Sequence, residues 1–68
     1  MARHYTTNQV KDMTGEELIR NTDLQAEIVE RIDLLEDGQI TSNDEHNRRV
    51  ALLNLENFSA EWARRFEG

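Results

Sequence analysis

Two long stretches with helical periodicity, separated by a short link, constrain the fold of this chain more than any other feature. Each begins with a capping-box pattern, Thr14-Gly-Glu-Glu17 and Ser42-Asn-Asp-Glu45, whose first side chain accepts from a backbone N–H while the glutamate reaches back. Apolar residues then recur every three or four positions, the spacing that places side chains on one face of a helix. They are Leu24, Ile28, Ile32 and Leu35 in the first stretch, and Ala51, Leu55, Phe58, Trp62 and Phe66 in the second. We therefore expect two amphipathic helices.

The link between these helices, Gly38 to Thr41, is long enough only to reverse the chain. Two helices of about 24 residues, each roughly 36 Å long, would then lie side by side. We expect an all-α fold of one domain: an antiparallel helical hairpin over residues 14–68, with a short N-terminal segment, residues 1–13. Gly38 is expected to end the first helix as its C′ residue.

Two local features refine this fold. Residues Thr6 to Met13 are expected to form a short helical turn, with Val10 and Met13 packed onto the hairpin. The run Asn21-Thr22-Asp23 is a second N-cap pattern inside the first helix. It leaves open whether that helix is continuous, kinked or split there.

Some apolar residues lie away from both stripes and predict self-association. They are Ile19 and Leu34 in the first helix, and Val50 and Leu53 in the second. Burying such a side chain stabilises by about 1.5–3 kcal/mol, and four left in water would form an adhesive patch. We expect a homo-oligomeric helical bundle, with these four residues at the interface. The alternative is that the N-terminal segment covers the second face within one chain.

Composition excludes several classes of protein. The 68 residues include no cysteine, which excludes disulfides, thiolate metal sites and cysteine nucleophiles. With 37% hydrophobic and 32% charged residues, the chain resembles neither a membrane span nor a fully disordered segment. No stretch approaches the roughly 20 apolar residues of a membrane helix. We expect a cytoplasmic protein without membrane contact.

The net charge of −6 is unevenly distributed, because residues 13–45 carry ten acids against two arginines. This acidic middle argues against direct binding to duplex DNA, whose phosphates require a concentrated basic face. Glu27, Glu30 and Asp33 recur at a spacing of three and lie along one flank of the first helix. They form either a solvated face or an acidic partner face that steers toward a basic protein surface, as a nucleic-acid mimic would.

The residue types required for catalysis are sparse. The histidines, His4 and His46, belong to no His-Glu-x-x-His or Glu-x-x-His pattern, so neither a zinc nor a di-iron site is indicated. The glycines are scattered, and the serines lack a positioned base. We expect a non-enzymatic protein with no metal and no cofactor.

A ligand site is predicted where the end of the second helix meets the start of the first. Arg64 and Arg65 could converge there with Tyr5 and Lys11, offering guanidinium forks for phosphate and a ring for a base. The alternative is that Arg65 pairs with Glu61 as an ordinary i,i+4 ion pair. In the same alternative, Arg48 pairs with Asp44 or Glu45, and Trp62 and Phe66 belong to the core.

The arrangement resembles the helical-hairpin sponges that phages use against cyclic-oligonucleotide immune signals. The local support is Arg-x-Val-Ala-Leu, Arg48 to Leu52, and the run Leu55-Glu-Asn-Phe58. The resemblance implies a non-enzymatic oligomer that sequesters a cyclic nucleotide in pockets between protomers, with Tyr5 and Lys11 among its ligand residues. The resemblance therefore implies a counter-defence factor that acts by stoichiometric sequestration or blocking, in the host cytoplasm if a phage encodes it. Two alternatives remain: an acidic inhibitor of a basic host protein surface, and a structural or assembly subunit that docks a larger protein.

Overall fold

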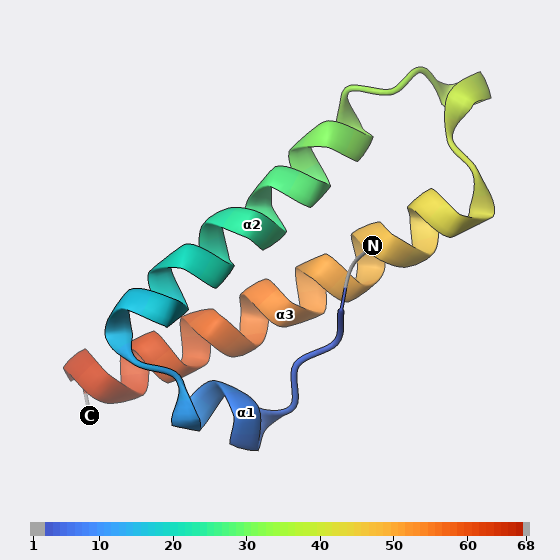
Figure 1. Cartoon of the computed structure of the whole chain (residues 1–68). Coiled ribbons are helices and arrows are strands. Elements are labelled where there is room, and N and C mark those ends of the chain that lie inside the picture. The colour runs from blue at the N-terminus through green and yellow to red at the C-terminus, as the bar shows by residue number, and fades with distance from the viewer. Residues whose placement is uncertain (1–2, 68) are drawn as a thin grey trace.

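The computed structural model describes residues 3–67, which form two long antiparallel helices and one short helix (Figure 1). The elements are α1 (Thr7–Asp12), α2 (Gly15–Asp33), a 3-10 turn η1 (Asp37–Gln39) and α3 (Ser42–Glu67). The helices α2 and α3 pack along each other, and α1 packs against α3 near the open end of the hairpin. The molecule is a rod of 43 × 18 × 17 Å. The predicted all-α hairpin is confirmed.

Reciprocal capping boxes set the starts of all three helices. The predicted box at α2 is present, with N–H to oxygen distances of 3.1 Å in both directions between Thr14 and Glu17. At α3 the box lies one residue earlier than predicted, between Thr41 and Asp44, at 3.0 and 3.1 Å. Ser42 is therefore the first helical residue and not the cap. An aspartate supplies the carboxylate there, in place of the glutamate of the expected pattern.

The prediction that Gly38 ends the first helix is wrong. α2 ends at Asp33, with Leu34 as its C-cap, and Gly38 lies inside η1 without the positive φ of a C′ glycine. The run Asn21 to Asp23 does not interrupt α2. Asn21 and Thr22 donate side-chain hydrogen bonds to the carbonyls of Glu17 and Leu18, at 2.8 and 2.7 Å, so their polar groups are satisfied within the helix.

The core lies where the N-terminal segment crosses the hairpin. Val10, Leu18 and Phe58 are fully buried together, and Tyr5 and Met13 pack against them. The Tyr5 and Phe58 ring centroids are 5.6 Å apart. The prediction of a short helical turn that packs through Val10 and Met13 is confirmed.

The core-facing side of α3 differs from the predicted apolar stripe. Its buried residues are Ala51, Asn54, Phe58 and Glu61. Trp62 is 38% exposed and Phe66 is 68% exposed, so their assignment to the core is wrong. In α2, Leu24 is likewise exposed while Gln25 is buried. The buried polar residues of this side have hydrogen-bond partners: backbone groups of the N-terminal segment bind Asn54, and the guanidinium of Arg65 donates to Glu61.

Candidate functional site

An open groove of about 420 Å³ runs between α2 and α3. Its lining residues are Leu18, Ile19, Thr22 and Asp23 from α2, and Leu55, Phe58, Ser59 and Trp62 from α3. Leu18 and Phe58 are fully buried and form its floor, whereas Ile19 is 52% exposed at its edge. None of the lining residues comes from the N-terminal segment. The groove is therefore a largely apolar surface that the chain itself leaves uncovered.

The α3 side of the open groove is apolar and ends in an aromatic pair. Leu55, Ser59 and Trp62 line it, and Phe66 continues the same face one turn later, since the spacings are four, three and four. The Trp62 and Phe66 ring centroids lie 4.6 Å apart with a tilt of 54°. The small side chain of Ser59 leaves space between the larger neighbours.

The α2 side of the open groove carries negative charge. Ile19, Asp23, Ala26 and Glu30 follow at spacings of four, three and four, so they share one face of α2. Asp23 and Glu30 are exposed, and neither has an ion pair or hydrogen bond among residues 3–67. None of the groove's lining residues is basic. The α2 edge therefore offers one unneutralised carboxylate, that of Asp23, and a second, that of Glu30, follows on the same face of α2 beyond the lining residues.

The predicted acidic partner face is divided by internal ion pairs. Glu27 is bound by Arg31 at 2.8 Å, and Asp33 is bound by Arg48 at 2.8 Å across the hairpin. This second pair replaces the expected partners of Arg48, which were Asp44 or Glu45. Of the three predicted acidic residues, Glu30 alone is left without an ion pair among the described residues.

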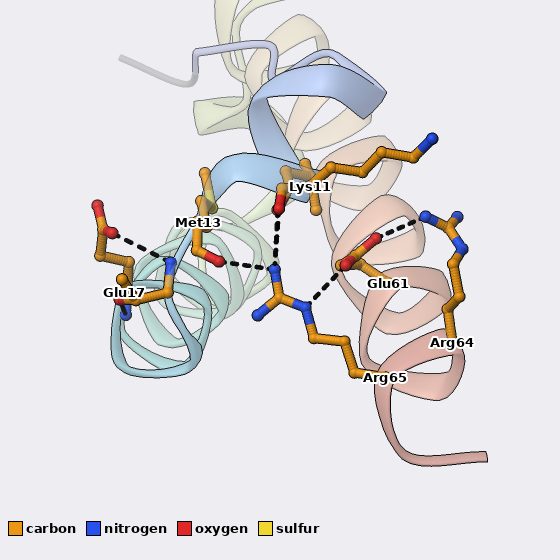
Figure 2. A network of polar contacts seen from close by, with 8 residues as sticks. Lys11, Met13, Glu17, Glu61, Arg64 and Arg65 are labelled. Carbon is orange, nitrogen blue, oxygen red and sulfur yellow. Dashed lines mark hydrogen bonds and ion pairs between the residues drawn. The ribbon is translucent and has the colours of Figure 1, made fainter. Parts of the chain in front are cut away.

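Arg65 occupies the junction between the end of α3 and the end of α1 (Figure 2). Its Nε donates to Glu61 Oε2 at 2.7 Å, which confirms the predicted i,i+4 pair. Its Nη2 atom lies within 3.4 Å of Val10 O, 3.3 Å of Lys11 O and 2.6 Å of Met13 O. These carbonyls lie at the C-terminal end of α1, where helices lack internal donors. Arg65 therefore caps α1 and fastens it to α3.

Glu61 accepts hydrogen bonds from both Arg64 and Arg65. It is buried, and Arg64 Nη1 donates to its second oxygen at 2.6 Å. The hydrogen bond from Arg65 is the main cause that lowers the pKa of Glu61 from its ordinary value of 4.5, against the opposing effect of burial. At the start of α2, the hydrogen bond from the backbone N–H of Thr14 likewise lowers the pKa of Glu17.

Tyr5 and Lys11 do not join Arg65 in one binding site. The Tyr5 ring packs on Phe58, its hydroxyl donates to Asn21 Oδ1 at 3.3 Å, and the Arg3 guanidinium lies 5.5 Å from the ring centroid. The depression beside Tyr5 is bordered by carboxylates and neutral side chains: Gln9, Asp12, Met13 and Glu17. The Lys11 side chain is exposed. The ligand role of Tyr5, Lys11, Arg64 and Arg65 stays a prediction, but Tyr5, Arg64 and Arg65 have internal partners.

The four predicted interface residues lie in different places. Ile19 borders the open groove, and Leu34, 80% exposed, lies just beyond the end of α2. Leu53 is 46% exposed on the outer surface of α3, beside Arg49 and Glu56. Val50 is half-buried. The N-terminal segment crosses Asn54 and Phe58, so the alternative that it buries Leu53 is wrong.

A buried amide cluster was missed by the sequence analysis. Asn54 is fully buried, accepts from the backbone N–H of Tyr5 at 3.0 Å, and donates to the Arg3 carbonyl and to Gln25 Oε1. Asn57 Nδ2 donates to the Tyr5 carbonyl at 3.3 Å. The one available signal was position, since Asn54 lies at helical spacing from Ala51 and Phe58.

The described residues form neither a clustered metal site nor a membrane-spanning helix. Residues 3–67 contain no group of three or more histidine, aspartate or glutamate side chains arranged to hold a metal ion. None of the described helices is long and apolar enough to cross a membrane. Comparison of the chain with protein-family models, curated proteins and solved structures gave no match.

Proposed function

We propose that this chain is a non-enzymatic binding protein that captures another protein stoichiometrically in the open groove between α2 and α3. The observation that carries the proposal is the exposure of Ile19 and Trp62 at the edges of a groove whose floor is fully buried. Apolar patches bordered by polar residues are typical of interaction surfaces, and tryptophan is enriched among the residues that dominate binding energy.

The amount of exposed surface supports the same function. The chain has a mass of 8.0 kDa and an accessible surface of 5062 Å². A folded monomer of this mass exposes about 4,450 Å² on average, so this rod exposes about 600 Å² more. One partner's share of a standard interface is about 800 Å². A partner seated along one face would therefore bring the exposed surface close to the usual value.

The geometry favours capture of a protein over sequestration of a nucleotide. Arg65, which would bind a phosphate, already holds Glu61 and the end of α1, and the Tyr5 ring is packed on Phe58. Sequestration of a cyclic nucleotide and a counter-defence role remain predictions that rest on the sequence resemblance.

Site-specific photo-crosslinking in the organism that encodes the chain tests the proposal. The photoreactive residue is placed at Ala26 and, in a matched variant, at Ala60; both alanines are exposed and neither lines the groove itself. Ala26 shares the face of α2 that carries Ile19 and Asp23, whereas Ala60 is turned away from the lining face of α3. We expect the Ala26 position to trap one other protein in a 1:1 product, and Trp62→Ala to abolish that product. Equal trapping from both positions, or a product that contains this chain alone, would contradict capture of a partner.

Homo-oligomer formation is the second candidate property. Leu34 and Leu53 are exposed outside the open groove, so a second copy could cover them while the groove stays available. Sedimentation equilibrium over a wide concentration range is the test. We expect a mass of at least two chains that falls to one chain in Leu53→Glu, with Arg49→Glu as the control on the same surface. A single-chain mass at every concentration would rule out assembly.

A further inference from the structure

The open groove has one acidic edge and one apolar edge, which restricts what can occupy it. Asp23 lines the α2 edge, and the exposed carboxylate of Glu30 lies on the same face of α2, seven residues or about 10.5 Å further along the helix and beyond the lining residues. On the α3 edge, apolar residues extend from Leu55 to Phe66 over about 16 Å. Because α2 and α3 are antiparallel, with Gln25 beside Asn54 and Asp33 beside Arg48, the apolar edge runs from the level of Asp23 toward the start of α2, and Glu30 lies on the other side of Asp23. An occupant must therefore present apolar groups over the groove and positive charge toward Asp23 and Glu30.

From this asymmetry we infer that the occupant of the open groove is a basic amphipathic helix of the captured protein, an inference that rests on the proposed function. Its apolar residues fill the space over Ser59, between Ile19, Leu55 and Trp62. Two lysines or arginines seven residues apart pair with Asp23 and Glu30. The spacing follows from the geometry, because positions i and i+7 lie on nearly the same face of any helix that runs along α2.

A helix suits this groove better than an extended peptide. Two long helices packed side by side leave a furrow into which the side-chain ridges of a third helix fit. The described part of the chain contains no β-strand, so it offers no strand edge to which an extended peptide could add. The apolar edge corresponds to about three helical turns.

A second copy of this chain is a poor occupant because its α2 and α3 helices carry little free positive charge. The arginines of α2 and α3, apart from Arg49, are each paired with a carboxylate of their own chain. A lone Arg49 cannot neutralise two carboxylates that are seven residues apart. A second copy would also bring its own net charge of −6 against the acidic edge.

Binding of two designed peptides tests the inference directly. Both are stapled helices of about 14 residues with the same leucine face and no tryptophan; one has lysines at the i and i+7 positions and the other has glutamates. The chain has a single tryptophan, Trp62, which lies in the groove and reports binding by its fluorescence. We expect the lysine peptide to bind about tenfold more tightly than the glutamate peptide at low salt, and the difference to shrink as salt is added.

Charge reversal identifies which carboxylates produce the preference. Asp23→Lys with Glu30→Lys should reverse it, so that the glutamate peptide binds more tightly. The matched control is Glu45→Lys with Glu56→Lys on the outer surface of α3, which changes the net charge equally and should leave the preference for lysine in place. Circular dichroism confirms that both double variants stay helical.

The other outcomes separate this inference from the proposed function. Equal affinity for the two peptides, a preference that survives reversal of Asp23 and Glu30, or no binding of either peptide would each overturn the basic helix. Crosslinking at Ala26 would still decide whether a protein occupies the groove. A fall in solution mass on reversing Asp23 and Glu30 would instead show that these carboxylates hold a second copy and would overturn the inference.

Discussion

The backbone N–H of Tyr5 donates to Asn54 Oδ1 at 3.0 Å, across 49 positions of sequence. The amide nitrogen of the same asparagine donates to the carbonyl of Arg3 and to Gln25 Oε1. The Asn54 side chain therefore hydrogen-bonds to an N–H and to a carbonyl group of the N-terminal segment and links this segment to Gln25 of α2. Asn54 therefore fixes the backbone of the N-terminal segment around Arg3 and Tyr5, in addition to the packing of Val10 and the Tyr5 ring against Phe58.

Substitution of Asn54 by alanine should release the N-terminal segment. It leaves the Tyr5 N–H and the Gln25 amide without their buried partner, which costs about 1–3 kcal/mol of unfolding free energy. Asn57→Ala is the matched control, since it removes a single hydrogen bond of 3.3 Å to the same segment. Urea unfolding followed by circular dichroism measures both. Equal losses for the two variants would show that Asn54 has no special role.

Arg65→Ala should destabilise the chain far more than Arg64→Ala. Arg65 is mostly buried and contacts three carbonyls at the end of α1, and hydrogen bonds to a charged group contribute about 1.5–3 kcal/mol. Arg64 is half exposed and touches only Glu61 within the described residues, so its removal should leave the unfolding free energy nearly unchanged. Hydrogen exchange of the α1 amides gives a second readout. Equal stability of the two variants would show that Arg65 does not cap α1, and Arg65 would then again be a candidate for ligand binding.

Local chemistry explains why much of the fold could be predicted from the sequence. The Thr14 cap depends on residues four positions apart at most, and Val10 packs where its helical turn must meet the hairpin. The shift of the second box from Ser42 to Thr41 shows the limit of such patterns. Thr41 and Ser42 each have an acidic residue three positions later, so the pattern alone did not distinguish them. In the structure, Asp44 is the carboxylate that accepts from the capping residue, Thr41.

The core-facing side of α3 could not be predicted, because it depends on a segment far away in sequence. Ala51, Asn54, Phe58 and Glu61 follow a regular helical spacing, but two of them are polar, and apolar periodicity therefore selected a neighbouring stripe. The N-terminal backbone makes Asn54 acceptable in the core, and Arg65 does the same for Glu61. The open groove is a consequence of this rotation, since it leaves Trp62 and Phe66 at the surface.

The position of the α3 cap is testable by two neighbouring substitutions. Thr41→Ala removes the side chain that accepts from the Asp44 N–H at 3.1 Å, and loss of an N-cap costs about 1 kcal/mol. Ser42→Ala changes the first helical residue, whose side chain has no hydrogen bond among the described residues, and should have little effect. Thermal unfolding compares the two. A larger loss for Ser42→Ala would place the cap where the sequence first suggested.

The buried carboxylate of Glu61 should make stability depend on pH in the acidic range. Its pKa is lower in the folded chain than the ordinary value of 4.5, because the charged form accepts from Arg65. A carboxylate of this kind stabilises the fold fully above its unfolded pKa, and the contribution is lost as the pH falls through the folded pKa. Wild-type chain should therefore exceed Glu61→Gln in melting temperature at pH 7, and the difference should shrink below about pH 4. Asn57→Ala removes a hydrogen bond without a titrating group, so its difference from wild type should stay constant. A Glu61→Gln difference that is equally constant from pH 7 to pH 3 would show that the Arg65 contact does not favour the charged carboxylate.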